Sequence, residues 1–165
     1  ATDMFSDDYA YFSSYSTSWL NHAKAFVEKM VVNFSLTKKS MVAEIAANDG
    51  YLLQYVKKAS IPCYGIEPTH STAIAARKKG IEIFEDFFGE TTAKKMADNF
   101  RQVDLAIANN VLAHVPDIND FVGGFSAILK FRTDFPLALG LHDDFDGVVR
   151  DLGGHVFWHF LVRCR

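Results

Sequence analysis

The stretch 41–53, with the sequence MVAEIAANDGYLL, constrains the fold of this chain more than any other. A short apolar run passes through small residues into Asn48, Asp49 and Gly50, and an amphipathic segment follows. This order is typical of a strand, a tight turn and a helix, and glycine permits the bend. In an open α/β sheet, ligands bind beyond the carboxyl ends of the strands, and the first such turn is the usual nucleotide corner. The stretch therefore predicts an α/β fold with a ligand site at this turn.

The residues of this turn favour one class of ligand. The phosphate-binding version carries Gly-x-Gly-x-x-Gly, whose bare backbone N–H groups hold a pyrophosphate. Here Ala46 and Asn48 stand in place of the earlier glycines, and two acids, Glu44 and Asp49, flank the turn. Carboxylates repel a pyrophosphate and attract a ligand with an ammonium or sulfonium group. We therefore expect S-adenosylmethionine rather than NAD. An ordinary βα turn without a ligand is the alternative.

The remaining pattern predicts a Rossmann-like, doubly wound and mostly parallel sheet, because strand and helix periods alternate along the chain. Strands are expected at 41–46, 62–68, 82–84 and 103–108. Helices are expected from Ser16 or Ser18 to about Asn33, at 51–59, from Thr69 or Ser71 to Gly80, from Thr91 or Thr92, and at 117–129. Ile74 and Ile118 are assigned to the buried faces of their helices.

Composition narrows the class of protein. A chain of 165 residues that is 49% hydrophobic and 22% charged is expected to form one globular domain. The net charge of -3 offers no footprint for nucleic acid or an anionic membrane, and no apolar run is long enough to span a bilayer. The polar, acidic beginning is unlike a secretory signal. Cys63 and Cys164 lie far apart, so we expect no metal site and a reduced, cytoplasmic compartment.

Acidic and aromatic residues follow the second and third strands. An acid at the end of the second strand of a nucleoside-binding α/β fold accepts hydrogen bonds from the ribose hydroxyls, and Glu67 holds that position. After the third strand, Asp86 is available to the exocyclic amine of an adenine and Phe87 to its ring face. Glu67 could instead be a solvated residue at the start of a loop.

The loop after the fourth strand lies at the same edge of the sheet. Asn109 and Asn110 supply hydrogen-bond donors and acceptors, and His114 can exchange protons near neutral pH. A structural histidine is the alternative. Near the N-terminus, tyrosines including Tyr9 and Tyr11 can pack on a core while their hydroxyls reach a cleft, or can simply dock the segment.

Four stretches, at 4–16, 44–53, 65–68 and 109–118, together resemble one family. It comprises the S-adenosylmethionine-dependent C-methyltransferases that act on nucleotide-linked 4-keto-deoxysugars. The resemblance runs from about Asp3 to Lys130. It implies a small-molecule nucleotide-sugar substrate whose C3 proton is removed, so that an enolate attacks the methyl group of the sulfonium.

The resemblance also implies roles for individual residues. Glu44, Asn48, Asp49 and Gly50 hold the methionine end of the cofactor, beside Ala46 of the same turn. Glu67 holds the ribose, and Asp86 with Phe87 holds the adenine, with Asn109 and Asn110 completing the cofactor site. His114, Tyr9 and Tyr11 face the sugar as catalytic residues.

The chain departs from the family in two ways. Family members begin with a cysteine-rich zinc domain, which this sequence has no residues to form. After Lys130 they continue with a segment that carries the probable base, whereas this chain runs into a tail in which His155 and His159 cannot be aligned with that segment.

We therefore divide the single domain into an N-terminal aromatic segment and helix (1–40), a Rossmann-like core (41–130) and an atypical tail (131–165). The sheet is expected to be incomplete at its C-terminal end, with its exposed edge covered by the tail or by a partner subunit. An inactive fragment that binds S-adenosylmethionine or a partner protein is the alternative function. The sequence leaves the oligomeric state open.

Overall fold

The computed structural model describes residues 11–99, 102–130, 138–140 and 159–163, the last two ranges by their backbone. Tyr9, Cys164 and most of the tail, including His155, lie outside these residues. The elements are η2 (Ser13–Tyr15), α1 (Thr17–Asn33), β1 (Val42–Ile45), α2 (Leu53–Lys58), β2 (Cys63–Ile66), α3 (His70–Lys78), β3 (Glu82–Phe84), α4 (Glu90–Asn99), β4 (Leu105–Asn109), η3 (Leu112–His114), α5 (Ile118–Ile128), β5 (Ala138–Gly140) and β6 (His159–Arg163).

One sheet with the strand order β3-β2-β1-β4-β6-β5 forms the centre of the fold. The strands β3, β2, β1 and β4 run parallel, and each neighbouring pair among them is hydrogen-bonded. The chain alternates between these strands and helices, because parallel strands need a crossover connection. The predicted Rossmann-like, mostly parallel sheet is confirmed.

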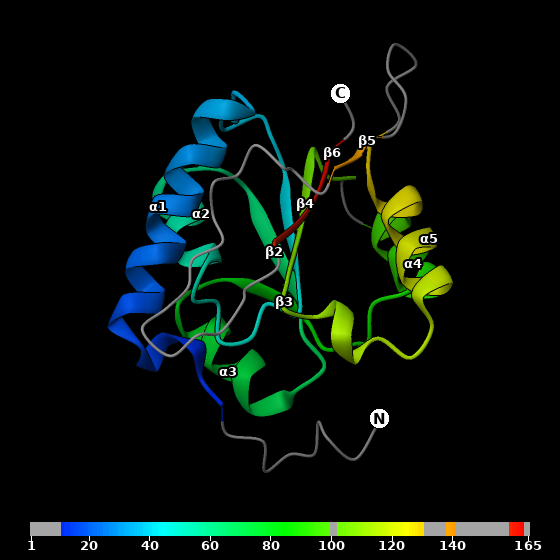
Figure 1. Ribbon diagram of the computed structural model, residues 1–165, viewed down its shortest axis with the longest axis horizontal. Helices are drawn as coiled ribbons and strands as arrows, with labels where there is room; N and C mark the ends of the chain where they lie inside the picture. The colour runs from blue at the N-terminus through cyan, green and yellow to red at the C-terminus, as the bar shows by residue number, and fades with distance from the viewer. Residues whose placement is uncertain (1–10, 100–101, 131–137, 141–158, 164–165) are drawn as a thin grey trace.

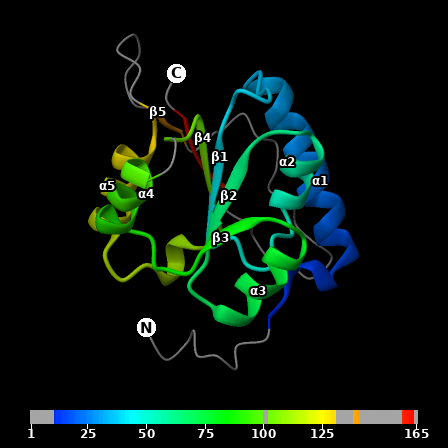
Figure 2. The ribbon, with the colours of Figure 1, turned by 180° about the vertical axis from the view of Figure 1, so that it is seen from behind.

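Helices cover both faces of the sheet (Figures 1 and 2). Helices α1 and α2 lie on one side, and α4 and α5 on the other. Successive residues of β1 therefore serve different cores, since side chains alternate along a strand. Val42 packs with the core beneath α1 and α2, whereas Ala43 and Ile45 pack with the core beneath α4 and α5.

The tail contributes two strands that the sequence did not predict. Residues of β6 pair antiparallel with β4, with His159 opposite Asn109, and β5 pairs antiparallel with β6. The strand β4 is therefore not an edge strand. We expected its edge to be covered either by the tail or by a partner subunit, and here strand β6 of the tail covers it.

Local sequence explains where two of the helices begin. The Ser16 hydroxyl caps α1 by accepting a hydrogen bond from Trp19 N at 3.3 Å. The Asp117 carboxylate caps α5 by accepting from Asn119 N at 2.9 Å and from Asp120 N at 3.1 Å. Such caps satisfy backbone donors that have no partner within the helix. Ser16 and Asp117 thus fix where these helices begin.

Two predicted core positions are wrong. Ile74 is 37% exposed and Ile118 is 56% exposed. On α3 the buried face consists of Thr72, Ala73 and Ala76, and it can accept Thr72 because its hydroxyl donates to the Thr69 carbonyl at 2.9 Å. Ile118 is the first residue of α5, where the helix projects beyond the core.

Candidate functional site

A cavity of about 570 Å³ opens beyond the carboxyl ends of β1, β2 and β4. This volume is within the range of small-molecule sites. Its wall comprises Tyr11, Ser13, Trp19, Ile45, Ala46, Asn48, Tyr51, Ile66, Glu67, Pro68, Thr69, Asp86, Phe87, Phe88, Asn109, Asn110, Val111, His114, Val115, Pro116, Asp117, Asp120 and Phe121. The structure therefore brings together predicted site residues from five separate parts of the chain.

The turn after β1 has an unusual backbone. Ala46 has a φ of 56° and Asn48 a φ of 50°, and both positions are those that glycine occupies in the phosphate-binding version of the turn. Gly50 has a φ of 73°, and a Cβ there would lie 2.5 Å from Cδ1 of Ile81. Left-handed backbone at a non-glycine residue is costly and clusters at functional sites. The turn keeps the glycine-type conformation with only two small side chains added at the cavity wall.

Glu67 is held rigidly at the end of β2. It is 5% exposed, and each carboxylate oxygen accepts a backbone hydrogen bond, Oε2 from Asn48 N at 2.8 Å and Oε1 from Thr69 N at 2.9 Å. Each oxygen has a second lone pair, so the carboxylate can still accept hydrogen bonds from a ligand. Glu67 also ties the turn after β1 to the turn after β2.

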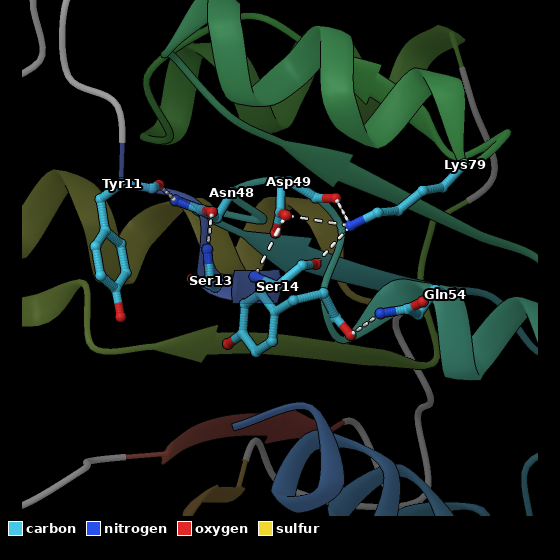
Figure 3. Close-up of polar contacts among 8 residues, drawn as sticks. Tyr11, Ser13, Ser14, Asn48, Asp49, Gln54 and Lys79 are labelled. Atoms are coloured by element: carbon cyan, nitrogen blue, oxygen red, sulfur yellow. Dashed lines mark hydrogen bonds and ion pairs between the residues drawn. The ribbon is translucent and has the colours of Figure 1, made fainter. Parts of the chain in front are cut away.

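The N-terminal segment is fastened to the same turn (Figure 3). Ser13 N donates to Oδ1 of Asn48 at 3.0 Å, and Nδ2 of Asn48 donates to the carbonyl oxygen of Tyr11 at 3.1 Å. Ser14 N donates to Oδ2 of Asp49 at 3.3 Å. The side chains of Asn48 and Asp49 thus hold Tyr11 and Ser13 at the cavity wall, whereas we expected them to contact the ligand itself.

Glu44 lies in the layer behind the cavity wall and is not one of the lining residues. It is completely buried, and neither carboxyl oxygen has a hydrogen-bonding partner within the described ranges. Burial raises the pKa of Glu44 well above its usual range, opposed by the nearby Tyr51 hydroxyl and reinforced by the charges of Glu67 and Asp49. Tyr51 separates Glu44 from the cavity and accepts a hydrogen bond from Nδ2 of Asn109 at 3.2 Å. The set Glu44, Tyr51 and Asn109 therefore connects β1 to the end of β4.

The loop after β3 supplies a mixed polar and aromatic wall. Oδ1 of Asp86 accepts from Phe87 N at 2.9 Å, and its Oδ2 accepts from the Thr92 hydroxyl at 3.1 Å. Phe87 is 54% exposed and lines the cavity. Asp86 is thereby oriented toward the cavity by the helix that follows it.

The loop after β4 forms the opposite wall. Asn109 is buried, while Asn110 is exposed with a φ of 53°. His114 ends η3 and is exposed at the cavity, as is Tyr11. The structure therefore places two of the three predicted catalytic residues on one cavity, the third, Tyr9, lying outside the described residues.

Comparisons with known proteins agree with this geometry. No protein-family model matches the chain. The C-methyltransferase NovU of Streptomyces niveus is 27% identical over 127 residues, which cover 77% of this chain and 30% of NovU. The chain thus spans about a third of the length of the curated relative it matches.

Solved structures share the fold. A structure described as an S-adenosyl-L-methionine-dependent methyltransferase from Methanococcus maripaludis matches with a TM-score of 0.52 and 15% identity, covering 66% of this chain and 51% of that one. A SAM-dependent methyltransferase from Aquifex aeolicus matches with a TM-score of 0.51 and 13% identity, covering 82% and 87%. The chain therefore has the Rossmann-like fold of these methyltransferases.

Several aromatic residues line the cavity without having been predicted there. Trp19 and Tyr51 stack with ring centroids 5.6 Å apart, and Phe88 packs against Phe121 at 5.4 Å. Helical spacing predicts that Trp19 and Phe121 lie on the apolar stripes of α1 and α5. A helical stripe can end at a cavity as well as in a core, and sequence periodicity does not distinguish the two.

Two features are absent from the residues that the structure describes. They include no group of three or more His, Cys, Asp or Glu side chains that could hold a metal ion. They also include no helix long and apolar enough to cross a membrane.

Proposed function

We propose that this domain binds S-adenosylmethionine in the cavity and transfers a methyl group to C3 of a nucleotide-linked 4-keto-deoxysugar. The position and contacts of Glu67 are the observation that most supports binding of the cofactor. A buried carboxylate that is fixed by two backbone N–H groups and opens onto a cavity is suited to accept hydrogen bonds from the two hydroxyls of a ribose.

The charge of the cavity fits a cationic adenosyl ligand. Four acidic residues line it, namely Glu67, Asp86, Asp117 and Asp120, and no Lys or Arg does within the described ranges. A sulfonium and an ammonium group are attracted by such a wall, whereas a dinucleotide pyrophosphate is repelled. The diphosphate of a nucleotide sugar would also be repelled by these acidic residues and would bind elsewhere.

The parts of the ligand follow from the walls of the cavity. Asp86 and Phe87 would hold the adenine, by a hydrogen bond to its exocyclic amine and by stacking. The turn at Ala46 and Asn48 would hold the methionine end of the cofactor. Asp49 and Gly50 would shape this turn. Glu44 would affect the methionine end indirectly, through Tyr51. Asn109 and Asn110 would complete the site on the β4 side.

The residues near the sugar would serve proton transfer. When bound, S-adenosylmethionine supplies an electrophilic methyl group. His114 is exposed at the cavity and is proposed to exchange a proton with the ketone-bearing part of the sugar, while Tyr11 donates a hydrogen bond to it. The 27% identity to a C-methyltransferase supports carbon as the atom that is methylated.

The first experiment is a calorimetric titration of the protein with S-adenosylhomocysteine, with NADH as the comparison ligand. We expect S-adenosylhomocysteine to bind and NADH not to bind. Binding of NADH alone would contradict our interpretation of the turn after β1. Binding of S-adenosylhomocysteine without turnover of 4-keto nucleotide sugars would instead favour the alternative, a domain that binds the cofactor or a partner without catalysis.

A further inference from the structure

Lys79 follows α3 and links it to the N-terminal segment at Ser14 and to the turn after β1 at Asp49. The proposed cofactor site gives Lys79 no role. Its Nζ donates to Oγ of Ser14 at 2.6 Å, to the carbonyl oxygen of Asp49 at 2.7 Å and to Oδ2 of Asp49 at 3.2 Å. Figure 3 shows Lys79 reaching the Asn48–Asp49 turn from the side opposite to Tyr11. All three protons of the ammonium group are therefore directed at the turn after β1 or at the segment that covers it.

We propose that Lys79 is a positioning residue that holds the segment 11–15 in place as one wall of the cavity. The proposal deepens the proposed function, because it concerns the same cavity, but the contact itself is independent of which ligand binds there. Lys79 does not line the cavity. Its effect on a ligand is exerted through Ser14 and Asp49.

The segment 11–15 has little else to hold it. Ser13 is its one buried side chain, while Tyr11 is 58% exposed and Tyr15 is 82% exposed. The helical turn η2 has no side-chain cap. A segment that buries so little apolar surface depends on its polar contacts, and its hydrogen bonds to other described parts of the chain lead to Asn48, Asp49 and Lys79.

The buried Asp49 carboxylate explains why a cation is needed at this point. The Asp49 side chain is 4% exposed, and the 29% exposed Lys79 is its ion-pair partner. Removing one partner of a buried pair leaves an uncompensated charge, which is costly. Without Lys79, the carboxylate would be drawn toward solvent and would release Ser14 N, and the segment would detach from the turn.

The test compares Lys79→Met with Lys78→Met in the protein without ligand. Lys78 is the preceding residue of the same helix and is exposed, so it controls for the loss of one positive charge. We expect hydrogen exchange of the Ser13 and Ser14 amides to become about tenfold faster in Lys79→Met and to stay unchanged in Lys78→Met. Unchanged exchange in Lys79→Met, or an equal acceleration throughout β1 and α3, would overturn the proposal.

Two further variants keep the test sharp if Lys79→Met proves unstable. Ser14→Ala removes one of the three contacts and preserves the ion pair, so a smaller acceleration confined to residues 13–16 is expected. Lys79→Arg retains the charge and should restore most of the protection. Full protection in Ser14→Ala together with none in Lys79→Arg would contradict a role for the ammonium group.

Ligand binding then separates this proposal from the cofactor proposal. We expect S-adenosylhomocysteine to bind about five- to tenfold more weakly to Lys79→Met, because part of the cavity wall is no longer preorganised. If the unmodified protein binds no S-adenosylhomocysteine, the proposed function fails while the exchange data still decide the role of Lys79. If it binds and Lys79→Met binds equally well, the positioning role fails alone.

Discussion

The two ends of the cavity differ in how deeply their polar groups are buried. At the β1–β2 end, Glu67 is buried and bonded to two backbone amides, and Asn48 and Asp49 are fastened to the N-terminal segment. At the β4 end, Asn110 and His114 are exposed. Preorganised groups suit the tight binding of one ligand, whereas exposed groups can adapt to a second one. This difference agrees with the proposal that Glu67 binds the cofactor and that His114 acts on the substrate.

The largest effect is expected for Glu67→Ala, which disrupts the rigid end. The amides of Asn48 and Thr69 lose their acceptor, and two unsatisfied backbone donors reduce the free energy of unfolding by about 2 to 4 kcal/mol. Binding of S-adenosylhomocysteine should fall below detection by calorimetry. Glu82→Ala, which removes an exposed glutamate of β3, is the matched control and should leave both quantities unchanged.

A smaller effect, confined to turnover, is expected when the exposed end is altered by His114→Asn. The asparagine keeps a polar side chain but cannot exchange a proton near neutral pH, so turnover of a 4-keto nucleotide sugar should fall about a hundredfold. Affinity for S-adenosylhomocysteine should not change. The exposed His70, which is bonded to Glu85 and does not line the cavity, provides the control variant His70→Asn. Unchanged turnover in His114→Asn would make His114 a structural residue.

Ala46→Gly changes only the backbone strain at the β1–β2 end of the cavity. It removes none of the polar side-chain contacts there. Because Ala46 has a φ of 56°, glycine should raise the free energy of unfolding by about 1 kcal/mol. The neighbouring Ala47 is fully buried and does not have a positive φ, so Ala47→Gly should lower the same quantity by about 1 kcal/mol. Urea unfolding of both variants tests this, and a loss of stability in Ala46→Gly would show that the left-handed turn is not strained.

The sequence predicted those parts of the site that depend on position along a strand. Parallel strands end at one edge, so Glu67 after β2 and Asn109 at the end of β4 could be placed there from hydrophobic periodicity alone. It did not predict contacts between segments far apart in the chain, such as Ser13 with Asn48 or Lys79 with Asp49. Nor did it predict that 159–163 would pair with β4, since a short apolar run does not specify its partner strand.

The smallest effect on the cavity is expected for Glu44→Gln, since Glu44 lies behind Tyr51 and does not line it. Its consequence should instead be a change in the pH dependence of stability. The folded pKa of Glu44 is raised by burial above its ordinary value of 4.5. Above pH 4.5 the unfolded chain therefore releases this proton while the folded chain keeps it, so the free energy of unfolding falls as pH rises toward the folded pKa.

Glutamine cannot titrate, so Glu44→Gln should lack this fall and should gain stability relative to the unmodified protein with each step above pH 4.5. Urea unfolding at several pH values measures the difference, with the exposed Glu82→Gln as a control that should follow the unmodified protein. Parallel curves for Glu44→Gln and the unmodified protein would show that the buried carboxyl group ionises as readily as an exposed one. A fall in affinity for S-adenosylhomocysteine, by contrast, would mean that the carboxyl group of Glu44 affects the ligand through Tyr51. The rigid end of the cavity would then act on the cofactor from its second layer of side chains as well as from its wall.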